Sequence, residues 1–186
     1  MSKKNSTIAA EMVDREAIRH LLFSYCRGID RVDVELIRSA YWPDGVDEHG
    51  NFTTTSAQDF VDHALPILQS MDSTKHFLPN ILIDIDGDRA YVESYTLAFH
   101  RMRAPDGKLF DNFTSGRWID LMERRNDEWR IKKRTVVRDF HREFMDAPGW
   151  QDGVMNKVLG YGRDSPPELG QPKPHDLSYK VLRHAD

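Results

Sequence analysis

The chain has 186 residues, of which 39% are hydrophobic and 30% are charged, a balance typical of one soluble globular domain with a substantial core. Its net charge of −4 and its dispersed basic residues disfavour a nucleic-acid partner, and its single cysteine, Cys26, excludes an internal disulfide and a thiolate zinc cluster. The first residues lack the apolar core of a secretory signal, and no apolar run is long enough to span a membrane. We therefore expect a cytoplasmic protein with no membrane partner.

Helical periodicity dominates the first part of the chain, after an expected N-terminal tail over residues 1–11. Asp14 is expected to cap a first helix, and Gly28 to close it near Asp30. Its apolar residues follow three- and four-residue spacing: Ile18, Leu21, Leu22, Tyr25 and Ile29. Asp33 is then expected to cap a second helix that carries Leu36, Ile37, Ala40 and Tyr41 and stops at Pro43.

A short hairpin and a third helix are predicted next. Residues 45–55 favour a hairpin around His49-Gly50-Asn51. Ser56 is expected to cap a helix kinked at Pro66. The apolar face of that helix comprises Phe60, Val61, Ala64, Leu65 and Leu68.

The period then changes to two, which predicts an antiparallel meander. Strands are expected over residues 81–85, 89–103, 112–125 and 129–141, with turns at 86–88, 105–107 and 126–127. On the last strand, Trp129 and Ile131 share one parity whereas Val136 and Arg138 share the other, which indicates a bulge or a sharp bend between them. Three helices followed by a meander predict an α+β fold over residues 12–145.

Residues 146–186 differ in composition from the rest of the chain. They are rich in Pro and Gly yet keep several large apolar side chains, including Trp150, Tyr161 and Tyr179. We expect an extended C-terminal arm lying over the domain or over a neighbouring subunit; a disordered tail is the alternative.

Asp30 lies where a helix normally prefers a cation, because the C-terminal end of the helix dipole is negative. One explanation is a surface ion pair with Arg27 or Arg31. The other is an inward-facing carboxylate that pairs with a histidine, for which His76, between the third helix and the first long strand, is the candidate. If the segment is extended, His76 and Asn80 face the same side. The eight histidines show no metal-ligand spacing, and no phosphate-binding loop or nucleophile elbow is present, so neither a metal nor a cofactor is expected.

Three motifs carry a family resemblance: Tyr25-x4-Asp30, His76-x3-Asn80 and Ile85-x-Gly87-Asp88-x-Ala90. Together with the element order, they resemble the SnoaL-like branch of the nuclear transport factor two-like superfamily, which includes bile acid 7α-dehydratases, hexachlorocyclohexane dehydrochlorinase and scytalone dehydratase. The resemblance implies a cone-shaped (cystatin-like) fold, in which a strongly curved antiparallel sheet wraps three N-terminal helices and encloses an apolar pocket.

The resemblance also implies roles for individual residues. Asp30 would orient His76, and His76 would remove a proton from carbon. Tyr25, which core packing explains equally well, would donate a hydrogen bond, and Arg138 would assist from the last strand, with Arg134 as its rival. We further expect four substrate-binding residues: Asn80, Tyr41, Trp42 and His100.

These residues lead to the hypothesis of a cofactor-independent lyase or isomerase, similar to a dehydratase, acting on a hydrophobic small molecule such as a polycyclic or aromatic one. The same fold also serves non-catalytic binding modules and the β-type subunits of aromatic-ring dioxygenases, which stay open as alternatives. Relatives of this kind form homo-oligomers, so we expect a trimer, or else a dimer.

Overall fold

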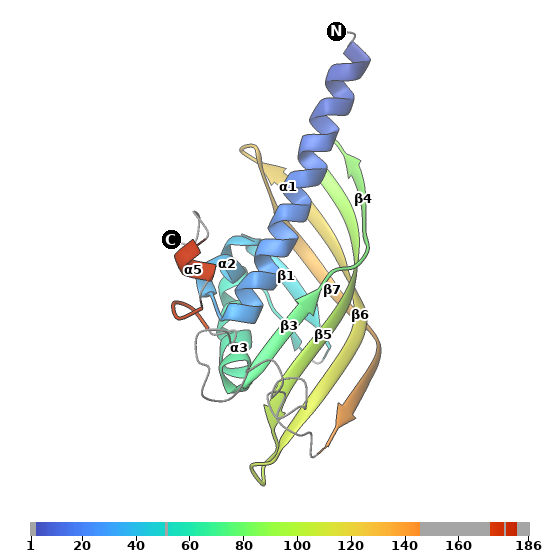
Figure 1. Cartoon of the computed structure of the whole chain (residues 1–186). Helices are drawn as coiled ribbons and strands as arrows, with labels where there is room; N and C mark the ends of the chain where they lie inside the picture. Colours follow the sequence, from blue (N-terminus) through green and yellow to red (C-terminus); the bar gives the residue numbers. More distant parts are fainter. Residues whose placement is uncertain (1–2, 51, 146–171, 177, 182–186) are drawn as a thin grey trace.

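The computed structural model describes residues 3–50, 52–145, 172–176 and 178–181, and shows helices lying against the inner face of one curved, unclosed sheet (Figure 1). The helices are α1 (Lys3–Arg31), α2 (Val34–Ser39), α3 (Ala57–Ser70) and α5 (Ser178–Val181). The strands are β1 (Tyr41–His49), β2 (Phe52–Thr53), β3 (Ser73–Phe77), β4 (Ile81–Asp86), β5 (Arg89–Arg103), β6 (Leu109–Arg125) and β7 (Glu128–Phe144). The predicted α+β class is therefore confirmed. No helix of the described residues is long and apolar enough to cross a membrane.

The first helix begins earlier than expected and ends at Arg31, close to the expected end near Asp30. It begins at Lys3, so Asp14 does not cap it; the Asp14 carboxylate instead accepts hydrogen bonds from Arg124 (3.0 Å) and from the indole of Trp129 (2.9 Å). Gly28 does not close it either. A Cβ at Gly28 would lie 3.0 Å from the Leu36 Cβ. The absence of a side chain at Gly28 therefore lets α2 pack closely against the last turn of α1.

The end of α1 carries backbone strain. The amide of Asp33 donates to the Gly28 carbonyl (2.8 Å) and that of Val32 to the Ile29 carbonyl, which is the Schellman pattern of a helix C-terminus. Val32 takes the left-handed position of this motif, with φ of 54°, where glycine is usual and a β-branched residue is disfavoured. This tight turn fixes Asp30 on one side of the helix end and Asp33 on the other.

The sheet is mixed, which corrects the expectation of a purely antiparallel one. Its strand order is β2-β1-β7-β6-β5-β3, with β4 also paired to β5. The pairs from β3 to β7 are antiparallel as predicted, but β1 pairs with β7 in parallel. The second helix is also shorter than predicted. It ends at Ser39, and Tyr41, which was expected to belong to it, is the first residue of β1.

The pairing of β6 with β7 has two register shifts, and the first confirms the irregularity predicted between Ile131 and Val136. The first lies between Leu121 and Met122; the second, between Ser115 and Gly116, was not predicted. At the second shift a Cβ on Gly116 would stand 2.3 Å from the Val137 carbonyl oxygen, so only glycine fits this close approach. The first shift turns Arg134 and Arg138 to the inner side of the sheet, and the second brings His141 to the same side.

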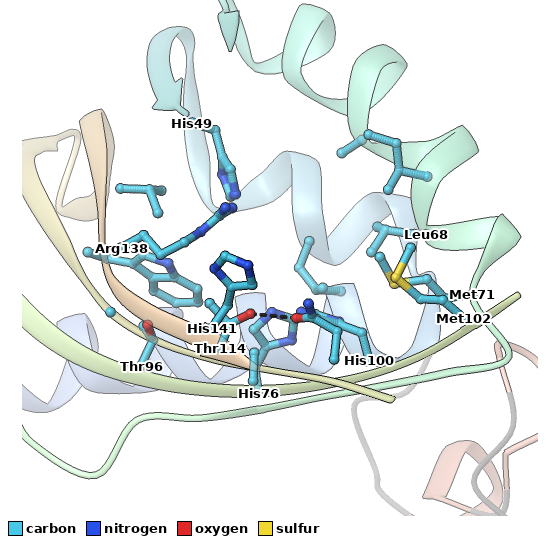
Figure 2. A pocket seen from close by; sticks show the side chains of 18 of the residues that line it. His49, Leu68, Met71, His76, Thr96, His100, Met102, Thr114, Arg138 and His141 are labelled. Atoms are coloured by element: carbon cyan, nitrogen blue, oxygen red, sulfur yellow. Dashed lines mark hydrogen bonds between the residues drawn. The ribbon is translucent and has the colours of Figure 1, made fainter. Parts of the chain in front are cut away.

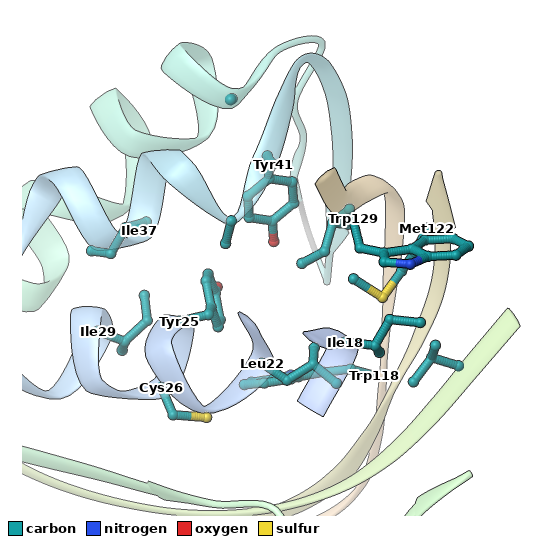
Figure 3. Packing of buried hydrophobic residues seen from close by; sticks show 14 of the residues in the cluster. Ile18, Leu22, Tyr25, Cys26, Ile29, Ile37, Tyr41, Trp118, Met122 and Trp129 are labelled. Carbon is teal, nitrogen blue, oxygen red and sulfur yellow. The ribbon is translucent and has the colours of Figure 1, made fainter. Parts of the chain in front are cut away.

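The core lies between α1, α2, α3 and the inner face of the sheet (Figure 3). Ile18, Leu22, Tyr25 and Ile29 all face it, which confirms the predicted apolar stripe of the first helix. Trp118, Met122, Trp129 and Ile131 cover it from the sheet.

A short C-terminal stretch packs beside the junction of α1 and α2. Asp33 caps α2 as predicted, accepting from the Leu36 amide, and its carboxylate also accepts from the Tyr179 hydroxyl (2.8 Å). Arg31 pairs with Asp176 (3.1 Å), and the Arg27 guanidinium lies 4.2 Å from the centre of the Tyr179 ring. These contacts place residues 172–176 and 178–181 over the domain. Most of the predicted arm, residues 146–171, 177 and 182–186, lies outside the described residues.

Candidate active site

The concave side of the sheet holds a cavity of about 470 Å³ beside α1 and α3 (Figure 2). Apolar side chains make most of its wall, including Phe60, Leu68, Met71, Met102 and Trp118. Its polar side chains include four histidines and one arginine: His49, His76, His100, His141 and Arg138. An apolar cavity with a few converging polar groups is the usual form of a small-molecule site.

Asp30 and His76 make two contacts, as expected for an orienting carboxylate. Oδ1 of Asp30 lies 2.8 Å from Nδ1 of His76, and Oδ2 accepts from the backbone amide of His76 at 3.1 Å. Both side chains are largely buried, with 13% and 12% exposed. The side chain of Arg31 pairs with Asp176 and donates only to the backbone carbonyl of Asp30. The Arg27 guanidinium donates to the Ser178 hydroxyl (2.8 Å), so the alternative of a surface ion pair between Asp30 and Arg27 or Arg31 is wrong.

The geometry also defines which ring nitrogen of His76 faces the cavity. Because Nδ1 lies against the Asp30 carboxylate, the neutral ring holds its proton there and leaves Nε2 free to accept another. His76 lines the cavity whereas Asp30 does not, so the carboxylate acts on the ring from behind.

His100, expected to bind substrate, lies beside His76 on the neighbouring strand and lines the cavity. The two ring centres are 5.4 Å apart, and the Thr74 hydroxyl lies 2.9 Å from Nδ1 of His100. Burial, and then the neighbouring His76, lower the pKa of His100 to about 4. His100 is therefore a neutral hydrogen-bonding group at neutral pH.

Tyr25 belongs both to the core and to the cavity wall. Its ring packs edge-on against Trp118 (5.3 Å between centres) and against Tyr41 (5.8 Å). Burial raises the pKa of the Tyr25 hydroxyl above its ordinary value, although the nearby Arg134 lowers it in part. The hydroxyl therefore stays protonated and can donate a hydrogen bond.

Arg134 and Arg138, the two candidates for the assisting arginine on β7, lie in different surroundings. Arg134 is completely buried and makes a bidentate pair with Asp120 (2.7 and 2.8 Å) beneath the rings of Trp118 and Tyr25. Burial by itself lowers the pKa of Arg134, but the Asp120 carboxylate outweighs it and holds the pKa well above its ordinary value. Arg138 lines the cavity, whereas Arg134 does not.

Three of the residues expected to bind substrate do not reach the cavity. Asn80 is exposed beyond the end of β3, because the strand stops at Phe77 and does not carry the alternation as far as Asn80. Trp42 is buried and donates to the Glu123 carbonyl, and Tyr41 is buried with its hydroxyl on Asp47 (2.6 Å). None of the three lines the cavity.

Two cavity histidines, His49 and His141, were not singled out from the sequence. His49 shares one face of β1 with Asp47, and this alternate spacing, Asp47-x-His49, was a usable signal. His141 enters the cavity only because of the register shift at Gly116, which no local pattern places. Among the described residues, no three His, Cys, Asp or Glu side chains are placed to hold a metal ion.

The model of the SnoaL-like domain family matches residues 10–135, which is more than half of the chain. The chain belongs to the SnoaL-like family. This family is a branch of the nuclear transport factor two-like superfamily, in agreement with the resemblance carried by the sequence motifs. No curated protein sequence matches the chain significantly.

Solved structures share the fold of this SnoaL-like protein. One is from Novosphingobium aromaticivorans and is proposed to be a scytalone dehydratase: TM-score 0.66, 23% identity, covering 74% of this chain and 91% of that one. A hexachlorocyclohexane dehydrochlorinase has TM-score 0.67 and 18% identity; the match covers 75% of this chain and 97% of the dehydrochlorinase chain. A cystatin-like protein of unknown function from Nostoc punctiforme has TM-score 0.58 and 20% identity, covering 68% and 92%. At such identities the likeness establishes the fold, and the reaction has to be argued from the site.

Proposed function

We propose that this protein is a cofactor-independent lyase or isomerase, similar to a dehydratase, in which His76 removes a carbon-bound proton from a hydrophobic small molecule. The observation that carries the proposal is the double contact of Asp30 with the ring and the backbone amide of His76, at 2.8 and 3.1 Å. It fixes the ring, keeps a proton on Nδ1 and steadies the imidazolium that forms when Nε2 accepts the substrate proton.

The wall around His76 suits a carbanion or enolate that develops next to a carbonyl. Tyr25, protonated and buried, offers a donor to the developing oxyanion, and Arg138 offers a positive charge at the cavity wall. The apolar remainder of the wall supports an aromatic or alicyclic substrate. Two of the structural relatives, the dehydrochlorinase and the protein proposed to be a scytalone dehydratase, have names that describe eliminations, which adds support.

A non-catalytic binding module would have no need of the buried pair. Such a module predicts Asp30 turned to solvent, or separated from His76 by more than about 4 Å. The separation of 2.8 Å therefore favours the enzyme. A dioxygenase β-type subunit is a separate alternative, which copurification with a larger iron-bearing chain would support.

The first prediction concerns proton abstraction alone. The wild-type protein is expected to catalyse exchange of the α-protons of β-tetralone for deuterium in heavy water, followed by proton NMR. His76→Gln should lower the exchange rate by about 10²–10⁴-fold, which is the usual contribution of a general base, and Asp30→Asn should lower it by a smaller factor because the ring is no longer oriented.

His20→Gln is the matched control, since His20 is exposed on α1 outside the cavity. Exchange at the wild-type rate in both His76→Gln and Asp30→Asn would rule out the pair as the base.

A further inference from the structure

A second carboxylate–imidazole pair lies on β1. Oδ1 of Asp47 is 3.5 Å from Nδ1 of His49, two residues further along the same face of the strand. Asp47 is completely buried, its Oδ2 accepts from the Tyr41 hydroxyl at 2.6 Å, and its backbone amide donates to the Thr54 hydroxyl at 3.1 Å. The carboxylate is thus fixed in place, as the orienting member of such a pair must be.

The two facing atoms of this pair are the ones left without hydrogen bonds. Oδ1 of Asp47 and Nδ1 of His49 are both buried, and neither has a hydrogen-bond partner among the described residues. A buried polar atom without a partner costs about 1–3 kcal/mol, so a shift of a few tenths of an ångström that joins them is favourable. The His49 ring stacks flat on Phe52, with centres 5.3 Å apart and planes at 1°, which holds it in position to make this bond.

His49 and His76 reach the same cavity from separated strands. In the strand order β2-β1-β7-β6-β5-β3, His49 is on β1 and His76 is on β3 at the far edge, so the curvature of the sheet brings them to one hollow. Figure 2 shows His49 entering from the side opposite His76, with the Arg138 side chain extending toward it. A substrate between them would meet a different imidazole at each end.

We propose that His49, positioned by Asp47, is a second catalytic proton-transfer residue, which gives a proton to a leaving hydroxyl group while His76 removes one from carbon. This rests on the proposed function and narrows it to dehydration. The C–H electron pair becomes the new carbon–carbon double bond as the C–O bond breaks. His76 gains a proton at Nε2. His49 begins the step as the imidazolium, with one proton on Nδ1 facing Asp47 and one on Nε2; it gives the Nε2 proton to the departing oxygen, which leaves as water, and becomes neutral.

Dehydration is the reaction that needs this second group. Hydroxide is a poor leaving group unless it is protonated, whereas a chloride or a phenolate leaves without a proton. General acid assistance contributes typically about 10²–10⁴-fold. Arg138, at the same side of the cavity, would stabilise negative charge on the oxygen before the proton arrives.

Two probes that share one carbon skeleton test the role of His49. They are the β-hydroxy ketone formed from acetone and benzaldehyde, and its para-nitrophenyl ether. Both eliminate to benzylideneacetone, which is followed by ultraviolet absorbance. His49→Gln should lower turnover of the hydroxy ketone by about 10²-fold or more and that of the ether less than threefold, while His76→Gln lowers both. His20→Gln serves as control.

Each kinetic outcome decides between the two claims. Equal losses for both ketones in His49→Gln, or a wild-type protein that eliminates only the ether, would overturn the role of His49 and leave His76 as the base. Full activity of His76→Gln, or a wild-type protein inert toward both ketones, would contradict the proposed function and with it the dehydration.

Histidine NMR tests the positioning without any substrate. In protein labelled with ¹⁵N-histidine, Nδ1 of His49 should carry a proton in the wild type and lose it in Asp47→Asn, because the amide no longer offers a carboxylate oxygen to Nδ1. The His49 signal is assigned from its disappearance in His49→Gln. An unprotonated Nδ1 in the wild type would overturn positioning by Asp47.

Discussion

Asp30 and Asp33 are three residues apart at the end of α1, yet their carboxylates contact different partners and have different roles. The Asp33 carboxylate caps α2 and binds Tyr179, so it joins the two helices to the C-terminal stretch. The Asp30 carboxylate turns the other way, and both of its oxygens are used on His76. A turn with Val32 in the left-handed region separates the two directions. At this scale, function depends on which way a short carboxylate points.

His100 gives the residue-scale prediction, a pH dependence of stability. Its pKa in the folded protein, about 4, lies below the ordinary value of 6.5, so the unfolded chain binds the proton more readily. The stability from keeping His100 neutral is therefore present above pH 6.5 and is lost as the pH falls toward 4. The difference between the two pKa values corresponds to a change of at most about 3 kcal/mol in the free energy of unfolding.

Urea unfolding at several pH values between 7 and 4 would measure this effect. The free energy of unfolding of the wild type should fall more steeply with pH than that of His100→Gln, while His20→Gln should follow the wild type. Parallel curves for wild type and His100→Gln would contradict the low pKa.

The bulges of β7 are the elements that build the cavity wall. At the register shift beside Gly116, the β7 backbone comes so close to β6 that there is no room for a side chain. The shift sets Arg138 opposite Gly116 and His141 opposite Thr114, and all four residues line the cavity. A regular strand pair would offer different side chains to the substrate.

Gly116→Ala is the element-scale prediction. Its new Cβ would meet the Val137 carbonyl at 2.3 Å, so the strands must separate, and we expect a loss of about 1–3 kcal/mol in the free energy of unfolding together with displacement of Arg138. Ser115→Ala, at the neighbouring position, should change stability far less. Chemical denaturation measures both variants; a loss below about 0.5 kcal/mol in Gly116→Ala would show that the close approach relaxes freely.

The whole molecule presents an aromatic row on the outer side of its sheet. The row comprises Phe77, Phe99, Phe113 and Phe140, from four different strands, with successive ring centres 6.3, 4.7 and 5.8 Å apart. Phe77, Phe99 and Phe140 are 54%, 41% and 48% exposed. Contiguous apolar surface of this kind marks an interaction site, so the row is where we place the contact of the expected homo-oligomer.

Light scattering coupled to size exclusion tests that placement. The wild type is expected to elute as a dimer or a trimer, and the double substitution Phe99→Glu with Phe140→Glu as a smaller species, because two carboxylates would have to be buried on association. Phe23→Glu, on an equally exposed phenylalanine of α1, should leave the assembly unchanged. A wild-type monomer, or an assembly insensitive to the double substitution, would exclude this face.

The sequence by itself determined the apolar stripe of α1, the capping of α2 by Asp33, the long strands and the pairing of Asp30 with His76, because each depends on local periodicity, capping chemistry or a family motif. The exact end of a strand, and hence the place of Asn80, was not encoded in that pattern.

Only the tertiary structure decided which side chains share the cavity. Residues on β1, β3 and β7 meet there because the sheet curves and β7 is bulged, and both features are set by contacts between segments far apart in the chain. The parallel pairing of β1 with β7 places His49 and its partner Asp47 at the cavity. The spacing of residues within one strand does not predict which strand lies on the opposite side of the cavity.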